Sequence, residues 1–146
     1  MGLEVKLARS EDKAEWCRLW EAYLDFYETK LGSGVYETSW ERILDPDSKM
    51  FSYLAHLDGR TIGLSNFLYH DSFWEAEERC YLNDLFVDPD IRGSGAGEAL
   101  IEATYQHAMA RGAVQVYWTT AHDNVVARGL YDKVAKLTPF IKYSKK

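Results

Sequence analysis

One segment in the middle of the sequence constrains the fold more than any other. Residues 80–87 have the pattern of a strand, which the Asp88-Pro89 pair ends. A helix is predicted from about Ala96 to Arg111, closed by Gly112. The turn between strand and helix carries three alternating glycines: Gly93, Gly95 and Gly97. A strand that leads through such a turn into a helix is typical of α/β proteins, in which helices cover a sheet.

Hydrophobic periodicity and turn residues place the other elements. A short strand at 3–8 precedes a helix that Ser10 caps and that stops near Gly32. The remaining predicted elements are a helix around 40–44 closed by Asp45-Pro46, strands at 51–56 and 61–69 joined by an Asp58-Gly59 turn, a strand at 114–119, a helix at 124–134 and a last strand at 139–143. This order predicts one α/β domain whose mixed sheet has antiparallel hairpins early and a βαβ crossover late.

Length and composition exclude several classes of protein. A chain of 146 residues buries enough surface to fold without a metal or a disulfide, and its two cysteines, Cys17 and Cys80, form no CxxC pair. We therefore expect no metal site and a reducing cytoplasm. No apolar run is long enough to span a membrane, and the first residues do not have the pattern of a signal peptide. The net charge of −6 disfavours nucleic acid as a partner.

The charge is distributed unevenly along the chain. Residues 1–91 contain 19 acidic and 9 basic side chains, whereas residues 92–146 contain 4 and 8. The first part could therefore favour a cationic partner and the second an anionic one. An uneven spread of solvated charges is the alternative.

The glycine turn is a candidate anion site. Glycine lets the backbone approach a ligand closely and adopt positive φ. The first N–H groups of a helix have no partner inside it, and the helix dipole favours a negative charge there. The spacing G-x-G-x-G differs from the dinucleotide fingerprint, and no Gly-Lys-Ser/Thr follows as in a P-loop. Small residues that merely pack at a helix start are the alternative.

The whole segment resembles the acetyl-CoA-binding motif of the GNAT superfamily of N-acetyltransferases, V-x-P-x-x-R-G-x-G-x-G/A. The matching residues are Val87, Pro89, Arg92, Gly93, Gly95 and Gly97. The surrounding sequence is similar to the histone/polyamine acetyltransferase subgroup and its bacterial relatives. The resemblance implies a single-domain GNAT fold over residues 1–146, with a mostly antiparallel sheet of about six to seven strands, splayed central strands and about four helices.

The same resemblance implies acetyl-CoA as co-substrate. Its pyrophosphate would lie on the turn, at Arg92, Gly93, Ser94, Gly95, Ala96 and Gly97. Its pantetheine arm would pair with the backbone of the preceding strand, at Leu85, Phe86 and Val87.

A second motif lies downstream. Residues 124–131 match the family pattern N-x-x-A-x-x-L-Y, in which the asparagine contacts the cofactor arm and the tyrosine lies near the thioester sulfur. These roles map onto Asn124 and Tyr131, whose spacing is about two helical turns, so that both lie on one helix face. We expect Tyr131 to contact the cofactor and to protonate the leaving thiolate. A helix-start asparagine and a core tyrosine are the alternatives.

The base that would deprotonate the acceptor amine is less constrained. Polyamine-type relatives often have a glutamate before the aspartate of the fourth strand, where this chain has Asn83 followed by Asp84. Asn83 can orient a water but cannot act as a base, and only one of the two faces the cleft from a regular strand. Asp84 is either a catalytic carboxylate or a buried structural acid. Proton loss through water and a role for His122 are the other possibilities.

The acidic part of the chain indicates an acceptor. In this family the first two helices and the loop between the third and fourth strands form the substrate wall. Here that wall contains Glu21, Asp25, Glu28, Glu37, Asp71, Glu75, Glu77 and Glu78. We expect a cationic primary amine, such as a polyamine, a lysine side chain or an amino sugar, to contact Tyr27, Tyr36, Trp74 and Glu75.

Two other functions also fit parts of the sequence. A non-catalytic acyl-CoA sensor would keep the glycine turn and is favoured by Asn83, and an unrelated nucleotide-binding module would use the turn differently. The family further implies a homodimer, for which residues 138–143 could supply an edge strand.

Overall fold

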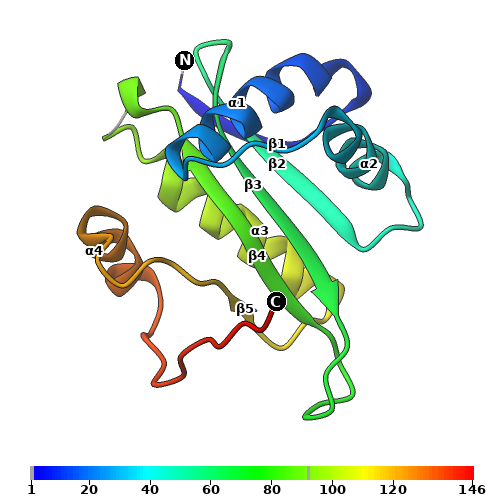
Figure 1. Ribbon diagram of the computed structural model, residues 1–146, viewed down its shortest axis with the longest axis vertical. Coiled ribbons are helices and arrows are strands. Elements are labelled where there is room, and N and C mark those ends of the chain that lie inside the picture. The colour runs from blue at the N-terminus through cyan, green and yellow to red at the C-terminus, as the bar shows by residue number, and fades with distance from the viewer. Residues whose placement is uncertain (1, 92) are drawn as a thin grey trace.

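A computed structural model describes residues 2–91 and 93–146 as a sheet between two helical layers (Figure 1). The strands are β1 (Leu3–Leu7), β2 (Met50–Leu57), β3 (Arg60–His70), β4 (Arg79–Val87) and β5 (Val116–Tyr117). The helices are α1 (Lys13–Phe26), α2 (Ser33–Leu44), α3 (Ala96–Arg111) and α4 (Val125–Val134), with 3-10 turns at Ser10–Asp12 and Pro89–Ile91. Within the described residues, every helix is too short or too polar to cross a bilayer.

The sheet is mixed, and its strands follow one another in chain order from β1 to β5. The first four strands are antiparallel, and β5 is parallel to β4 because α3 carries the chain back across the sheet. Asp58 and Gly59 turn the chain between β2 and β3 with φ of +51° and +85°, which confirms the predicted hairpin turn.

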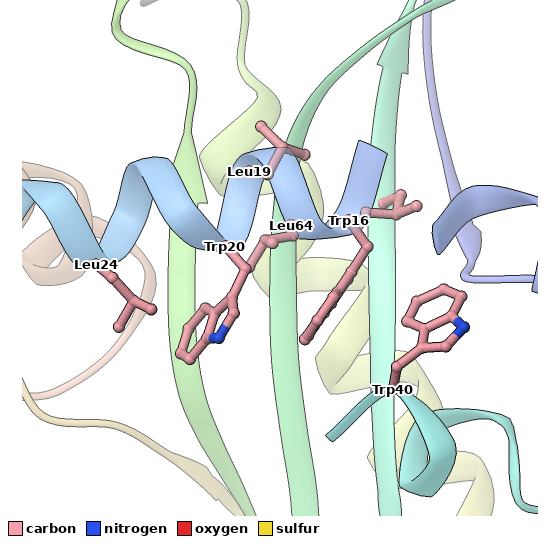
Figure 2. Close-up of a cluster of buried hydrophobic side chains, with 7 residues drawn as sticks. Trp16, Leu19, Trp20, Leu24, Trp40 and Leu64 are labelled. Carbon is pink, nitrogen blue, oxygen red and sulfur yellow. The ribbon is translucent and has the colours of Figure 1, made fainter. Parts of the chain in front are cut away.

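Two cores hold the layers together. On one face, α1 and α2 pack on β2 and β3 through three tryptophans, and Figure 2 shows Trp16 and Trp20 of α1 with Trp40 of α2. The Trp16 ring lies 6.0 Å from that of Trp20 and 5.4 Å from that of Trp40, between centroids. On the other face, α3 buries a row of side chains against the sheet: Ala96, Leu100, Ile101, Thr104 and Ala108.

The prediction of six to seven strands is wrong, since the sheet formed by residues 2–91 and 93–146 has five. The strand predicted at 114–119 contributes only Val116 and Tyr117 to the ladder, and residues 139–143 form no strand. Phe140 and Tyr143 are 81% and 90% exposed. A strand forms only where a neighbouring backbone offers hydrogen bonds, and the two-residue β5 offers this segment very little edge.

The first helix also differs from its prediction. It ends at Phe26, six residues before Gly32, because Glu28 adopts φ of +53° and the Thr29 N–H donates to the Leu24 carbonyl at 2.9 Å. A glutamate in the left-handed conformation gives no sequence signal for a helix end. Ser10 lies within the 3-10 turn rather than capping it, and the Asp12 carboxylate instead accepts from the Arg9 N–H at 2.8 Å.

Candidate active site

The central strands diverge, as predicted. β4 and β5 pair only at Cys80 with Val116 and at Tyr81 with Tyr117. β4 then continues for six residues to Val87, bonded to β3 on one side, while the chain after β5 turns away toward α4 (Figure 1). On its β5 side, the second half of β4 therefore has backbone groups that no described strand pairs. Leu85, Phe86 and Val87, the predicted pantetheine contacts, lie in this half.

A β-bulge lies where the strands diverge. Asn66 of β3 is opposite Asp84, but the next residue, Phe67, is opposite Leu82, so Asn83 is the extra residue. The bulge reverses which side of the sheet each later residue faces: Leu82 packs toward α3 before it, and Leu85 does so after it. The expectation that only one of Asn83 and Asp84 faces the site assumed a regular strand. In the bulged strand their side chains are joined by a hydrogen bond of 2.8 Å.

Asp84 is at the centre of a buried polar network beneath α1. Its Oδ2 accepts from the Asn83 Nδ2 at 2.8 Å and from the Asn66 Nδ2 at 3.3 Å. Asn66 is held in turn by the indole N–H of Trp16 at 3.1 Å. Asp84 is only 8% exposed, and burial raises its pKa, although hydrogen bonds from Asn83, Asn66 and the Tyr23 hydroxyl partly offset this rise.

The predicted phosphate turn has the expected backbone geometry. Gly93 and Gly95 have φ of +85° and +83°, a conformation that a side chain disfavours, and no atom lies within 4 Å of where a Cβ would project from either. The first turn of α3 follows at once, with Ala96 buried and its N–H donating to Ser94 Oγ at 3.3 Å. The N–H groups at a helix start have no partner inside the helix, and such a position favours an anion. Ser94 completes the described part of the turn, whereas the predicted contact at Arg92 lies outside the described residues.

Gly97 has a different role from the other two glycines. A Cβ on Gly97 would lie 3.2 Å from Leu130 Cδ2, so its missing side chain lets α4 approach the first turn of α3. Gly93 and Gly95 thus have the backbone conformation that the predicted anion site requires, whereas Gly97 allows close packing of two helices.

α4 presents Tyr131 toward the divergence. Tyr131 is half-buried, with its ring 5.4 Å from that of Trp118 between centroids. Burial raises its pKa, and the neighbouring Tyr27 adds to the rise, so the hydroxyl remains protonated at neutral pH. Asn124 caps α4: its Oδ1 accepts from the Ala127 N–H at 3.4 Å and its Nδ2 donates to Thr120 Oγ1 at 3.5 Å.

The predicted substrate residues separate into two groups. Tyr27 lies at the end of α1, close to Tyr131, and Tyr36 lies on α2 near Glu21 and Asp25. Trp74 and Glu75 lie in the loop between β3 and β4, at the other end of those long strands from the glycine turn (Figure 1). No described contact joins the two groups, which therefore do not form one surface.

Ion pairs change the interpretation of the acidic loop. Glu75 binds Arg79 through both carboxylate oxygens, with N–O distances of 2.6–3.2 Å. Glu78 pairs with Lys49 at 2.7 Å and with Arg111 at 3.0 Å. These bases neutralise much of the acid in the β3–β4 loop. Among the described residues, Glu21 and Asp25 on α1 have no such partner.

Sequence reasoning missed several residues near the divergence. Tyr23 of α1 packs on Phe86 with ring centroids 6.0 Å apart, and burial raises its pKa. Gly63 of β3 lies against β4, where a Cβ would meet the Phe86 carbonyl at 2.8 Å. Such contacts depend on strand pairing, which no local motif in the sequence announces.

Other possible sites lack these features. His122 is exposed and contributes only its carbonyl, which accepts from Arg128 at 2.7 Å. A surface hollow of about 560 Å³ on α2, lined by residues such as Val35 and Arg42, contains none of the predicted site residues. Across residues 2–91 and 93–146, the side chains of His, Cys, Asp and Glu form no cluster suited to a metal ion.

Sequence comparison identifies the family. The profile of the acetyltransferase (GNAT) family matches residues 16–135, and the chain belongs to this family. Within it, the chain is 37% identical over 143 residues to the D-amino-acid N-acetyltransferase HPA3 of Saccharomyces cerevisiae, covering 97% of this chain and 89% of that protein. It is 30% identical over 132 residues to the uncharacterized N-acetyltransferase YhfO of Bacillus subtilis, covering 90% and 87%.

Solved structures share the fold. The aminoglycoside N-acetyltransferase AAC(6')-Iy in complex with CoA has a TM-score of 0.86 at 19% identity, covering 99% of this chain and 94% of that chain. A ribosomal-protein-alanine N-acetyltransferase from Brucella melitensis biovar Abortus 2308 has a TM-score of 0.85 at 18% identity, covering 100% and 99%. The predicted GNAT fold and the enzyme class, N-acetyltransferase, are confirmed.

Proposed function

We propose that this enzyme transfers the acetyl group of acetyl-CoA directly to a primary amine. The observation that carries the proposal is the half-paired strand β4, which ends at the glycine turn of α3 and is flanked by Tyr131 of α4. In this arrangement the turn 93–97 binds the pyrophosphate, together with Arg92 by family resemblance. The backbone of Leu85, Phe86 and Val87 holds the pantetheine arm, which leaves the thioester near the bulge at Asn83.

The residues at the divergence then have distinct roles. Backbone N–H groups near the bulge stabilise the oxyanion that develops when the amine attacks the thioester carbonyl. Tyr131 donates its proton to the leaving thiolate, consistent with its raised pKa. Asn83 orients a water or the acceptor, and Asp84, buried and hydrogen-bonded, holds Asn83 in place through the 2.8 Å bond between them. Asn124 positions α4 and contacts the cofactor arm.

The acceptor is proposed to be a cationic primary amine. Glu21 and Asp25 carry negative charge near Tyr36, and Tyr27 offers an aromatic face beside Tyr131. Trp74 is 83% exposed but lies in the distant β3–β4 loop, where Arg79 neutralises Glu75, so these two residues are not part of the proposed acceptor surface on α1. A polyamine or an amino sugar fits this distribution of charge, with the cation directed toward α1.

A free amino acid is the second candidate acceptor. The 37% identity to a D-amino-acid N-acetyltransferase favours it, because that relative aligns over nearly the whole chain. An amino acid brings a carboxylate, which the acids of α1 would repel, so acceptor charge distinguishes the two candidates.

We further propose a homodimer in a reducing, cytoplasmic setting. The exposed side chains of Phe140, Ile141 and Tyr143 would be covered by a second copy, and Cys17 and Cys80 are free thiols. Light scattering at several concentrations tests the dimer, and a monomeric mass throughout would contradict it.

The function is tested by following thiol release from acetyl-CoA with one acceptor at a time: spermidine, a lysine peptide, D- and L-amino acids, and an aminoglycoside. We expect turnover with a polycationic amine. Turnover with amino acids alone would favour the second candidate. Tight binding of acetyl-CoA without turnover by any acceptor would favour the sensor function, and failure to bind it would refute the cofactor site.

A further inference from the structure

A hydrogen-bonded pair of side chains lies beside the predicted reaction centre. At the end of β3, the His70 Nε2 lies 2.7 Å from the Tyr117 hydroxyl, and the His70 Nδ1 lies 2.8 Å from the Asp71 carbonyl oxygen. A carbonyl oxygen can only accept a hydrogen bond, so in neutral His70 the proton is on Nδ1. Nε2 is then left to accept from the tyrosine hydroxyl. The backbone thus selects the tautomer in which His70 can take a proton from Tyr117.

Tyr117 is located where β4 and β5 separate. It is the last residue of β5 in the ladder, opposite Tyr81 of β4, and the two rings stack with centroids 5.0 Å apart. Its neighbours Val116 and Trp118 pack in the core on the α3 side, so Tyr117 faces the opposite side of the sheet, the side of α1. Asn83 follows Tyr81 by two residues, a distance of about 7 Å along a strand.

We propose that Tyr117 contacts the acceptor amine and passes a proton from its ammonium group to His70. This inference rests on the proposed acetyl transfer and supplies its missing proton acceptor. The ammonium N–H bond breaks and its proton goes to the Tyr117 oxygen, while the original hydroxyl proton moves to His70 Nε2. The products are the free amine and an imidazolium, and Tyr117 remains a neutral phenol throughout.

The remaining protons also balance. The free amine attacks the thioester carbonyl, forming the C–N bond, and collapse breaks the C–S bond. Tyr131 gives its proton to the sulfur and regains one, through water, from the nitrogen of the new amide. His70 returns its proton to solvent, which it can reach because its side chain and that of Tyr117 are only half-buried.

Asp84 is less suited to the same task. Both amide donors, from Asn83 and Asn66, converge on its Oδ2, and the carboxyl is 8% exposed beneath α1. Protonation of Asp84 would weaken these hydrogen bonds, because a charged acceptor binds donors more tightly than a neutral one. The His70–Tyr117 pair has no comparable set of competing donors in the described structure.

The charged and titratable groups around His70 come from β4, from β5 and from the loop between β3 and β4. Arg79 of β4 lies opposite His70 in the antiparallel pairing of β3 and β4. Glu75 of the loop is close enough to His70 for the imidazole to affect the pKa of Glu75. Tyr81 lies beyond, stacked on Tyr117, and burial raises the pKa of Tyr117 itself. Glu75 and Arg79 form an ion pair with each other, with an N–O distance of 2.6 Å.

The test compares the wild-type enzyme with His70→Gln and Tyr117→Phe, using Tyr81→Phe as the matched control. Each protein is assayed with two acceptors from about pH 5 to 9, an interval that includes the range in which histidine side chains change charge. One is an alkyl amine that the wild type acetylates, and the other is its β,β,β-trifluorinated analogue, which is mostly neutral at pH 7 because the three fluorines lower the pKa of its ammonium group. Circular dichroism and the KM for acetyl-CoA report on folding and on the cofactor site.

We expect both variants to lower kcat for the alkyl amine about 100-fold or more, the usual scale of general base catalysis. His70→Gln also removes the acidic limb of the plot of kcat against pH. With the fluorinated amine the variants work nearly as fast as the wild type, because that acceptor needs no initial deprotonation. Tyr81→Phe, which keeps the stacked ring, retains wild-type rates with both amines.

Equal losses with both amines would overturn the proposal, since a purely structural role cannot distinguish acceptors by their protonation. Unchanged kcat for His70→Gln and Tyr117→Phe would also overturn it while leaving acetyl transfer intact. If one variant misfolds, the other carries the comparison. No turnover by the wild type with any amine would instead refute the proposed function, and this inference with it.

Discussion

Replacing Gly63 by alanine tests whether the spacing of β3 and β4 depends on a missing side chain. The added Cβ would lie 2.8 Å from the Phe86 carbonyl oxygen, 3.2 Å from Leu100 Cδ1 and 3.3 Å from Val87 Cγ2. The two side-chain atoms can move, but the carbonyl belongs to a β4 backbone that is paired with β3 at this level. Relief therefore requires the two strands to shift, and overpacking of this kind costs about 1–3 kcal/mol.

For a domain of this size, such a cost lowers the melting temperature by roughly 3–10 °C. Thermal unfolding followed by circular dichroism measures it. Because Phe86 and Val87 are predicted to hold the pantetheine arm, the same shift weakens binding of acetyl-CoA, which calorimetric titration measures. The matched control is Gly129→Ala in the middle of α4, where a Cβ meets no atom within 4 Å.

Gly129→Ala makes the same chemical change in open space, and alanine in a helix is favoured over glycine by about 0.5–1 kcal/mol. We therefore expect it to raise the melting temperature slightly. A Gly63→Ala protein as stable as the wild type would refute the reasoning, since it would mean that β3 and β4 adjust without strain. A similar loss in both variants would point to a general intolerance of alanine rather than to the Phe86 contact.

The remaining predictions concern charge and proton transfer. Because burial raises the pKa of Asp84 in the folded state, the wild type loses stability as the pH rises from about 4 through that raised value. Asp84→Asn removes this loss. In urea unfolding, the free energy of unfolding of the variant relative to that of the wild type should therefore be higher at pH 7.5 than at pH 4. Tyr131→Phe should lower kcat about 100-fold with little change in the KM for acetyl-CoA, measured by thiol release. Glu21→Gln with Asp25→Asn should raise the KM for spermidine severalfold, whereas Glu75→Gln should raise it much less because Arg79 already neutralises Glu75.

Each of these predictions has a result that contradicts it. A difference between Asp84→Asn and the wild type that is constant with pH would mean that Asp84 titrates normally. Full activity of Tyr131→Phe would show that Tyr131 is not the acid that protonates the leaving thiolate. If Glu75→Gln raised the KM for spermidine more than Glu21→Gln with Asp25→Asn does, the result would indicate that the acceptor binds at the β3–β4 loop.

The candidate site was predictable where it depends on local sequence. The glycine turn is continuous in the chain, so its residues and the start of α3 at Ala96 agree with the sequence prediction. The same holds for α4, where Asn124 caps the helix. The bulge at Asn83 was not predictable, because it arises from a mismatch in register between β3 and β4. Sequence alternation therefore gave the wrong relation between Asn83 and Asp84.

The ion pairs of the acidic residues in the predicted substrate wall were also not predictable from the sequence. Counting charges along the chain could not show that Glu75 binds Arg79 or that Glu78 binds Lys49, 29 residues away in the sequence. Ion pairs form between side chains that the fold brings within about 4 Å of each other. The sequence alone does not show which side chains come this close.

By itself, the sequence determined the order and type of most elements, the glycine turn before α3 and the family. These properties depend on neighbours a few residues apart, through periodicity, turn conformation and helix ends. The tertiary structure decided how many strands join the sheet and where β4 and β5 part. It also brought together pairs such as His70 and Tyr117, 47 residues apart. Pairing between distant strands depends on which backbones meet and in what register, and only the packed chain specifies both.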